Sequence, residues 1–572
     1  MDLSVCQNLI SLVPSELTIF FEIGIMIIIA AILAFLIRLV RQPLIPAYII
    51  TGILLGPLAL GLIQDPHLVK SLSEIGVAFL IFTAGLEIKF KKLREVGKVA
   101  SIGGVFQIAI LFAIAFFIST WFGFIGKAPI YIGLVVAFSS TMIVMKLLAD
   151  KRELNSLHGR IVIGILLVQD IIAIIALSVL ASDLTLNSIL IVLLKAFIFG
   201  IIAIILAKVM NPIFNIAAKN HELLILVSIS FLFTFVIGSF IAGLSLIIGA
   251  FFAGVALANS NYKVEIEGKI RPLRDFFAVI FFVALGLQLA PIPKQLLILM
   301  LILLVLVIVI KPWIIMFSVR IFGYKRKTSF LTGNALAQTS EFSLIIVTLG
   351  LGLGHISQDL FSALVLLTII TMSLTTYFII YERKIEKYMD LPLILFNKFK
   401  SDKENLEYSV KDGKRTILFG CHRAGSLLIK ELKNNKEDLL VIDYNPEIIK
   451  SLINKKIPCI YGDFANPEVL SKANLKNAEM VISTIPDFED NLLLIKKTRN
   501  LNSKVPIFVI TTRISEALKL YKEGADYVII PQVMGGEKFF ELMKKIKRDK
   551  TSVKEMKKEH LRHLKEIHHL LY

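Results

Sequence analysis

Residues 159–180 read GRIVIGILLVQDIIAIIALSVL. Asp170 stands midway along this apolar run, with Gln169 beside it and no basic residue within a helical turn. A carboxylate at bilayer depth costs about 2.5 kcal/mol or more, so it persists where it lines a polar cavity or an ion path. The alternative is a buried Asp that hydroxyls and amides of neighbouring helices satisfy. The stretch therefore predicts a membrane helix that carries a functional carboxylate.

The rest of the chain also has the composition of a membrane protein, because 56% of its 572 residues are hydrophobic and only 19% are charged. Apolar runs that are long enough to cross about 30 Å of hydrocarbon recur as far as Tyr381. We predict thirteen spans, near residues 18–37, 45–62, 72–88, 101–122, 129–147, 160–182, 187–208, 222–239, 241–258, 275–289, 294–319, 328–352 and 360–381. Residues 1–382 would thus form a polytopic α-helical membrane domain.

Basic residues gather in alternate connections between these spans. Arg38 and Arg41 follow the first span and Lys151 and Arg152 follow the fifth, whereas the intervening loops carry isolated lysines such as Lys127. Because basic loops stay in the cytoplasm, we expect an integral protein of the cell membrane with its N-terminus outside and its C-terminus cytoplasmic. The first residues also lack the basic region of a cleavable signal peptide.

The net charge of +18 and the three cysteines exclude some function classes. A strongly basic chain could bind nucleic acid, but loop bias and a lysine-rich C-terminal tail explain the charge, so we expect no nucleic-acid partner. Cys6, Cys421 and Cys459 lack metal-ligand spacing, and no metal site is expected.

After Tyr381 the pattern changes to short apolar strands that alternate with helical stretches. Residues 383–414 read as a charged linker, residues 415–540 as a cytoplasmic α/β Rossmann-like domain, and residues 541–572 as a basic amphipathic tail. Zinc binding by the histidines of the tail is a weaker alternative to a solvated helix face. The predicted strands are 416–420, 439–443, 459–463, 480–485, 506–512 and 527–531, which predicts a doubly wound parallel sheet.

The turn after the first of these strands reads GCHRAG, from Gly420 to Gly425. A dinucleotide-binding turn has the pattern G-x-G-x-x-G, in which the second glycine lets phosphate approach the backbone. His422 replaces that glycine here, so His422 or Arg423 would reach phosphates with side-chain donors instead.

Two carboxylates complete the predicted nucleotide site. Asp443 ends the second strand, where a carboxylate accepts ribose hydroxyls, and Asp463 ends the third strand beside the same crevice. No catalytic group stands out near this crevice, so we expect a regulatory sensor of adenine nucleotide (AMP, ATP/ADP or NAD(H)) rather than an enzyme. The alternatives are a domain that has lost its ligand and a redox role for Cys421.

Two other ionisable residues share the depth of Asp170 in the membrane. Asp170 lies about 15 Å from the cytoplasmic end of its span, Lys311 about 14 Å and Glu341 about 20 Å, at 1.5 Å per residue. Three such groups on three helices indicate one site. The alternative is a static buried ion pair between an acid and Lys311. Lys195 is a weaker candidate, which could extend to the interface or pair elsewhere.

Small hydroxyl residues at mid-membrane mark two helix breaks. The stretch FSSTMIVMK (138–146) places Ser139, Ser140 and Thr141 there, and ALAQTSEFS (335–343) places Gln338 beside Glu341. Such side chains serve unwound backbone where discontinuous helices form ion sites. The alternative for either stretch is hydroxyl-rich helix packing.

These residues together resemble the Kef-like branch of the monovalent cation:proton antiporter-2 family, and the C-terminal sheet is similar to its RCK, or TrkA-N, domain. The resemblance covers nearly the whole chain. It rests on PAYIITGILLGPLALG (46–61), EIGVAFLIFTAGLEI (74–88), the SST and VQDIIAI stretches around Ser139 and Asp170, GLSLIIGAFFAGVALANS (243–260), IRPLRDFFAVIFFVALGL (270–287), IKPW at Lys311 and AQTSEFSLII (337–346).

The resemblance implies inverted repeats, crossing discontinuous helices and a homodimer in membrane lipid. It implies that potassium or sodium and a proton compete for Asp170 during alternating access, and that Lys311 pairs with this acid. Sodium-handling electrogenic relatives carry a second Asp where Gln169 stands, so a single Asp resembles the electroneutral potassium–proton subgroup. The connection ANSNYKVEIEGKIRPLRDF (258–276) lacks the acidic character of glutathione-gated members, which argues against glutathione control.

Three other function classes compete with a potassium–proton antiporter. A sodium–proton antiporter differs only in its ion. A potassium efflux channel opened by the RCK domain would need a carbonyl filter such as TVGYG, which the sequence lacks. A membrane-tethered dehydrogenase would need a substrate domain after the sheet, where only a short tail remains. We therefore expect a secondary transporter and not an enzyme.

Overall fold

The computed structural model describes residues 18–40, 42–63, 66–87, 99–151, 153–154, 156–182, 185–258, 260, 262–324, 326–382, 385, 407–408, 415–421, 424–434, 438–443, 445–462, 467–548, 556–558 and 560–562. The chain divides into two compact units, residues 1–154 with 158–400 and residues 155–157 with 401–572. His422, Arg423 and Asp463, most of the predicted linker and most of the tail lie outside the described residues.

Each predicted span coincides with a helix or with consecutive helices of the first unit. They are α2 (Thr18–Leu39), α3 (Leu44–Leu55), α4 (Pro66–Glu87), η1 (Val99–Gly103) with α6 (Gly104–Trp121), α7 (Ala128–Ala137) with α8 (Thr141–Asp150), α9 (Leu157–Leu180), α10 (Leu186–Ala217), α11 (His221–Ile241), α12 (Leu246–Leu257), α13 (Lys263–Leu287), α14 (Lys294–Val305) with η2 (Leu306–Ile310) and α15 (Lys311–Ile321), α16 (Arg326–Ala335) with α17 (Glu341–Gly352), and α18 (Gln358–Ile380). In the described part of the chain, eight helical stretches are long and apolar enough to cross a membrane.

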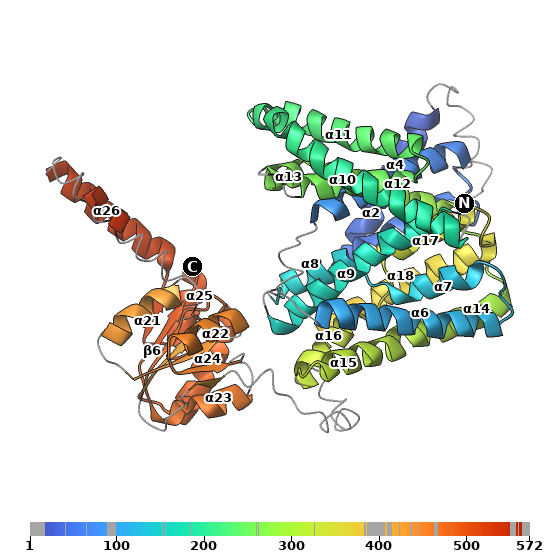
Figure 1. Cartoon of the computed structure of the whole chain (residues 1–572). Helices are drawn as coiled ribbons and strands as arrows, with labels where there is room; N and C mark the ends of the chain where they lie inside the picture. The colour runs from blue at the N-terminus through green and yellow to red at the C-terminus, as the bar shows by residue number, and fades with distance from the viewer. Residues whose placement is uncertain are drawn as a thin grey trace. The chain divides into compact units, whose positions relative to one another are not determined.

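These helices form two groups, which Figure 1 shows on opposite sides of the unit. In the first group, α13 packs on α3 and α4, and α12 packs on α4, α10 and α11. In the second group, α7 packs on α6 and α17, while α18 packs on α14, α16 and α17. Each half of the membrane domain contains one broken helix, α7 with α8 in the first half and α16 with α17 in the second. The two broken helices agree with the expected discontinuous helices.

Glycine pairs hold the first group together at very short range. A Cβ on Gly52 of α3 would lie 2.0 Å from a carbonyl oxygen of α13 and 2.7 Å from the Cα of Gly286. A Cβ on Gly254 of α12 would lie 2.1 Å from a carbonyl oxygen of α4 and 3.0 Å from the Cα of Gly85. Small residues let helix backbones approach this closely in membranes. Each of these two contacts thus joins a helix of the first half of the membrane domain to a helix of the second half.

The second unit contains a seven-stranded sheet in the order β1-β4-β3-β2-β5-β6-β7. Its strands are β1 (Glu407–Tyr408), β2 (Arg415–Phe419), β3 (Leu439–Asp443), β4 (Cys459–Tyr461), β5 (Ala478–Ser483), β6 (Ile507–Ile510) and β7 (Tyr527–Ile529). Strands β2 to β7 are parallel, as the sequence predicts. The order reverses at β2, so the end of β2 borders the crevice where such sheets bind ligands.

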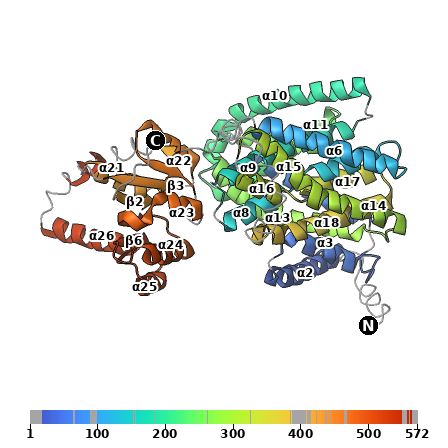
Figure 2. The ribbon, with the colours of Figure 1, turned by 90° about the horizontal axis from the view of Figure 1, so that it is seen from below.

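Helices cover both faces of this sheet (Figure 2). One apolar cluster joins the sheet to α21 (Ala424–Asn434) and α22 (Pro446–Asn454). Another joins its other face to α23 (Pro467–Ala473), α24 (Phe488–Leu501) and α25 (Ile514–Lys522). The helix α26 (Pro531–Arg548) follows β7. Strand residues alternate between the two clusters, because successive side chains of a strand point to opposite faces.

The antiparallel strand β1 was not expected, because residues 407–408 fall within the predicted linker. Glu407 and Tyr408 pair with Ile460 and Cys459 of β4. A two-residue edge strand is held by its main chain and carries no hydrophobic alternation. The sequence pattern therefore gave no signal for it.

Candidate functional site

Both predicted helix breaks are present, and a serine caps the N-terminus of the helix that follows each break. The first separates α7 from α8, where the Ser140 hydroxyl accepts a hydrogen bond from the Ile143 amide at 3.3 Å. The second separates α16 from α17, where the Ser340 hydroxyl accepts from the Phe342 amide at 3.1 Å. Hydroxyl side chains satisfy amides at a helix N-terminus that have no carbonyl partner in the helix. The small hydroxyl residues therefore make the breaks possible inside the membrane.

The two breaks lie against one another. The Ser139 hydroxyl donates to the Leu336 carbonyl at 3.0 Å, and the Gln338 side chain donates to the Ser140 carbonyl at 3.4 Å. The Met142 amide, in the first turn of α8, donates to the Glu341 carboxylate at 3.4 Å. The unwound backbone of each half of the chain is therefore paired with the other half.

Lys311 binds carbonyl oxygens of both breaks. Its ammonium donates to the carbonyls of Val136 at 2.9 Å, Phe138 at 2.7 Å and Gln338 at 2.7 Å, and its side chain is fully buried. The expected pairing of Lys311 with Asp170 is wrong, because three donors are occupied by three carbonyls. These carbonyls lie at or just after the C-terminal ends of α7 and α16, where a helix carries partial negative charge.

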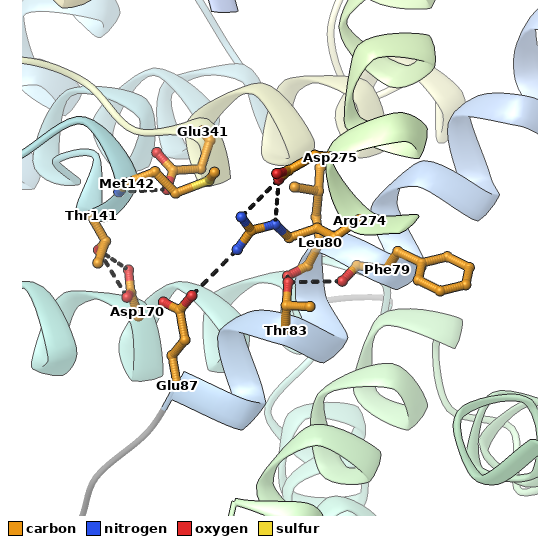
Figure 3. Close-up of polar contacts among 10 residues, drawn as sticks. All are labelled: Phe79, Leu80, Thr83, Glu87, Thr141, Met142, Asp170, Arg274, Asp275 and Glu341. Carbon is orange, nitrogen blue, oxygen red and sulfur yellow. Dashed lines mark hydrogen bonds and ion pairs between the residues drawn. The ribbon is translucent and has the colours of Figure 1, made fainter. Parts of the chain in front are cut away.

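Asp170 instead lies at the N-terminal end of α8. The Thr141 hydroxyl, on the first residue of that helix, lies 2.9 Å and 3.1 Å from the two carboxylate oxygens (Figure 3). Among the residues that the structure describes, no lysine, arginine or histidine forms an ion pair with Asp170. The neighbouring Gln169 accepts a hydrogen bond from the Ser139 amide at 2.9 Å. The hydroxyl and the positive end of the helix therefore stabilise the carboxylate without neutralising it.

Three polar atoms around the breaks are buried and make no hydrogen bond to any described residue. They are Nε2 of Gln169, Oε1 of Gln338 and Oε2 of Glu341. Buried polar atoms nearly always have a partner in native proteins. The Gln338 and Glu341 oxygens are suited to a cation, and the Gln169 amide to an oxygen ligand such as water.

Sequence reasoning missed two charged residues beside this site. Arg274 of α13 lies 3.3 Å from the Glu87 carboxylate at the end of α4 and 2.8 Å from Asp275. Figure 3 shows this group next to Asp170 and Glu341, and its charges interact with theirs. Arg274 lies just before the predicted span 275–289, in the basic connection, and Glu87 lies near the end of the predicted span 72–88, where no role was assigned to it. The available signal was their position inside two of the stretches that carry the family resemblance.

Lys195 does not join the site. Its ammonium donates to the carbonyl of Ala242, at the C-terminal end of α11, at 3.1 Å. It therefore satisfies a helix end elsewhere in the membrane domain.

In the second unit, the turn after β2 has the geometry of a tight strand–helix connection. Gly420 has a φ of +83°, and a Cβ on Gly425 would lie 2.2 Å from the Gly420 carbonyl oxygen. The first glycine therefore allows the turn, and Gly425 allows α21 to begin close to it. His422 and Arg423, between them, lie outside the described residues.

Asp443 holds this turn in place. One of its oxygens accepts from the Cys421 amide at 2.6 Å, and the other accepts from the Asn445 amide at 2.7 Å. Carboxylate oxygens accept hydrogen bonds from amides and hydroxyls alike, so a ribose hydroxyl is a chemically suitable donor to this residue. Asp463, predicted to lie beside it, is outside the described residues.

The thiol of Cys421 is buried next to Asp443. Burial, together with the Asp443 charge, raises the pKa of Cys421 to about 12. The thiolate is the reactive form of cysteine, so this thiol is poorly suited to redox sensing at neutral pH. Within the described part of the chain, no cluster of His, Cys, Asp and Glu could hold a metal ion.

Comparison with known proteins identifies both units. The family model for the transmembrane sodium/hydrogen exchanger matches residues 25–380, and the TrkA-N domain model matches residues 416–531. The putative cation/proton antiporter YbaL of Escherichia coli is 26% identical over 542 residues, which cover 88% of this chain and 93% of YbaL. The glutathione-regulated potassium-efflux system protein KefC of Salmonella arizonae is 25% identical over 461 residues, which cover 78% of this chain and 72% of KefC.

A solved structure supports the fold of the first unit. The sodium proton antiporter MjNhaP1 of Methanocaldococcus jannaschii aligns with a TM-score of 0.50 at 14% identity. The alignment covers 67% of this chain and 99% of MjNhaP1.

Proposed function

Because this chain belongs to the sodium/hydrogen exchanger family of integral membrane proteins, we propose that it exchanges potassium for protons and that its TrkA-N domain regulates the exchange. The relatives named above include a putative cation/proton antiporter and a potassium-efflux protein. These names support a monovalent cation as substrate.

The observation that carries the proposal is the environment of Asp170. Its carboxylate is bound by the Thr141 hydroxyl, and Lys311 is occupied by backbone carbonyls. A carboxylate without a permanent counter-charge can take either a proton or a cation. Competition between these two ligands for one group is the basis of antiport.

The proposed cycle uses oxygen ligands that belong to both broken helices. Deprotonated Asp170 binds the cation together with oxygen atoms of Thr141, Gln338 and Glu341. The second helix group then moves against the first, and a proton displaces the cation from Asp170 on the other side of the membrane. The two helix groups provide the separate bodies that such a movement requires.

Gln169 supports the assignment of potassium as the transported ion and of an exchange that moves no net charge. Its amide cannot take up or release a proton, so the pair Gln169–Asp170 carries a single exchangeable charge. One potassium would then replace one proton. The transport assay distinguishes exchange of potassium from exchange of sodium.

The transport assay uses purified protein in liposomes that contain a pH-sensitive dye, with potassium and sodium added in turn. We expect potassium-driven proton flux that Asp170→Asn abolishes, because an amide cannot carry a proton or neutralise a cation. Ser182→Ala, at the end of the same helical region, is the control. Full transport by Asp170→Asn would exclude Asp170 from the mechanism, and flux with sodium alone would show that Gln169 does not select potassium.

We further propose that an adenine nucleotide binds at the carboxyl end of β2 and β3. Support comes from the TrkA-N match, the tight turn at Gly420 and the position of Asp443. Asp443→Ala should weaken binding of NADH, ATP or AMP, because it removes the ribose acceptor and frees the Cys421 amide. Asp438→Ala, on an exposed residue just before the same strand, should leave binding intact. Identical calorimetric titrations for both variants would refute this assignment.

A further inference from the structure

We propose that the Lys151–Glu382 ion pair transmits regulation from the TrkA-N domain to the Asp170 carboxylate. The pair fixes the far end of α8 to the residues at which α18 leads into the connection with that domain. This inference rests on the proposed function, since it specifies how the same ion site is regulated.

The first contact lies at the C-terminal end of α8. Lys151 is the C-cap residue of this helix, and its ammonium donates to the Ile379 carbonyl at 2.9 Å and to the Glu382 carboxylate. The Glu382 side chain is 5% exposed and that of Lys151 is 26% exposed. The pair is thus largely shielded from water, and it joins α8 to α18 at one defined place.

The other end of α8 carries the residue that binds Asp170. Thr141 is the first residue of this ten-residue helix and donates to the Asp170 carboxylate at 2.9 Å. An α-helix of this length is a stiff rod of about 15 Å. A displacement of Lys151 therefore moves the Thr141 hydroxyl relative to Asp170, rather than being absorbed within the helix.

The end of α18 also binds the second broken helix. The side chain of Asn334, near the end of α16, donates to the Phe378 carbonyl at 2.9 Å. One helical turn earlier in α18, the Thr375 hydroxyl donates to the Ala337 carbonyl, inside the second break, at 2.5 Å. The last two turns of α18 thus contact both discontinuous helices that form the ion site.

The chain connects this place directly to the regulatory domain. Glu382 is followed by residues 383–414, and the first strand of the parallel sheet begins at Arg415. A change in the TrkA-N domain that pulls on this connection reaches Ile385, which packs against Phe330 and Leu331 of α16, and then Glu382. Within the described residues, the pair is therefore the ion pair that lies nearest to this connection along the chain.

The charges around Glu382 determine how strongly the pair is held together. Burial raises the pKa of Glu382, the Glu153 charge raises it further, and Lys151 opposes both effects. Glu153 in turn lies 3.9 Å from Lys151 and 3.2 Å from the His158 imidazole. Separating Lys151 from Glu382 would leave a buried carboxylate beside another acid, which is costly. The pair consequently resists separation, so a displacement of Glu382 carries Lys151 with it.

The test measures potassium–proton exchange in proteoliposomes with and without nucleotide, using NADH, ATP and AMP in turn. The quantity compared is the ratio of the two rates. Lys151→Gln and Glu382→Gln should bring this ratio close to unity, while Lys151→Arg, which retains the charge, should preserve it. The reversed pair Lys151→Glu with Glu382→Lys should recover part of the response. Lys146→Gln, on an exposed lysine of the same helix, should behave as the unmodified protein.

Two further measurements separate the inference from the proposed function. Calorimetric nucleotide binding and thermal unfolding show whether each variant keeps a folded domain and its ligand. Wild-type nucleotide control in both Gln variants would overturn the inference, and so would a wild-type exchanger whose rate no nucleotide changes. In either case Asp170-dependent exchange would still stand, but an unresponsive wild-type protein would also refute the proposed regulation by nucleotide. Absence of exchange in the wild-type protein would instead refute the proposed function.

Discussion

Replacing Lys311 by Met tests whether this lysine supports the helix breaks or the charge of Asp170. The substitution removes three donors from the carbonyls of Val136, Phe138 and Gln338. A buried carbonyl left without a partner costs about 1–3 kcal/mol. Removal of the buried ammonium offsets part of this loss of stability, because the desolvation penalty of its charge disappears. We therefore expect Lys311→Met to lower the free energy of unfolding by roughly 3 kcal/mol or more.

The matched control is Lys195→Met. Lys195 is also a lysine within an apolar helix, but it binds a single carbonyl, that of Ala242, and is exposed. Its replacement should cost less than about 1.5 kcal/mol. Unfolding of the detergent-solubilised protein can be followed by size-exclusion chromatography after heating, with both variants measured in the same detergent.

A double-mutant cycle with Asp170→Asn identifies the partner of Lys311. If Lys311 served Asp170, the two substitutions would be strongly coupled, as expected for the two members of a buried ion pair. The carbonyl contacts predict nearly additive effects, within about 0.5 kcal/mol. A coupling energy above about 2 kcal/mol, or an unchanged stability in Lys311→Met, would refute the assigned role.

Three other perturbations follow from contacts of the membrane unit. Arg274→Gln removes a positive charge beside the acidic site, so the apparent KM for potassium should fall severalfold, and an unchanged KM in flux assays would place Arg274 outside the ion path. Gly52→Ala should lower the thermal stability strongly, because its Cβ would lie 2.0 Å from the α13 backbone. Gly24→Ala, which places its Cβ in open space, should not lower it. Equal losses of stability in the two variants would contradict the close contact. Burial and nearby Lys127 lower the pKa of His355 below 6.5, so the folded protein favours neutral imidazole. Stability should therefore fall as the pH drops below 6.5, and His355→Gln should remove that loss in thermal unfolding between about pH 8 and pH 5.

The membrane helices and their breaks could be predicted from the sequence because both follow from composition along the chain. Apolar runs specify spans, and the stretches around Ser139 and Gln338 specify where a helix can be interrupted. The parallel sheet followed from strands that alternate with helices. These features depend on local pattern, so one sequence is enough to find them.

The partners of the charged residues could not be predicted in the same way. Depth along the helices brought Lys311 and Asp170 to one level, but depth does not say which side of a helix faces which neighbour. The orphan carbonyls that bind Lys311 exist only once two breaks meet in space. The contact between Arg274 and Glu87 was missed for the same reason, since it joins positions that are 187 residues apart.

The fixed partners of Lys311 determine whether the membrane voltage or the pH difference drives the proposed exchange. On the proposed mechanism, its charge stays on backbone carbonyls whichever ligand Asp170 holds, so only one carboxylate alternates between a potassium ion and a proton. The moving unit then has the same net charge in both directions. Membrane voltage, worth about 2.3 kcal/mol per charge per 100 mV, would neither drive nor oppose the exchange. The potassium gradient would instead follow the pH difference, with each pH unit, about 1.4 kcal/mol, balancing roughly a tenfold ratio of potassium.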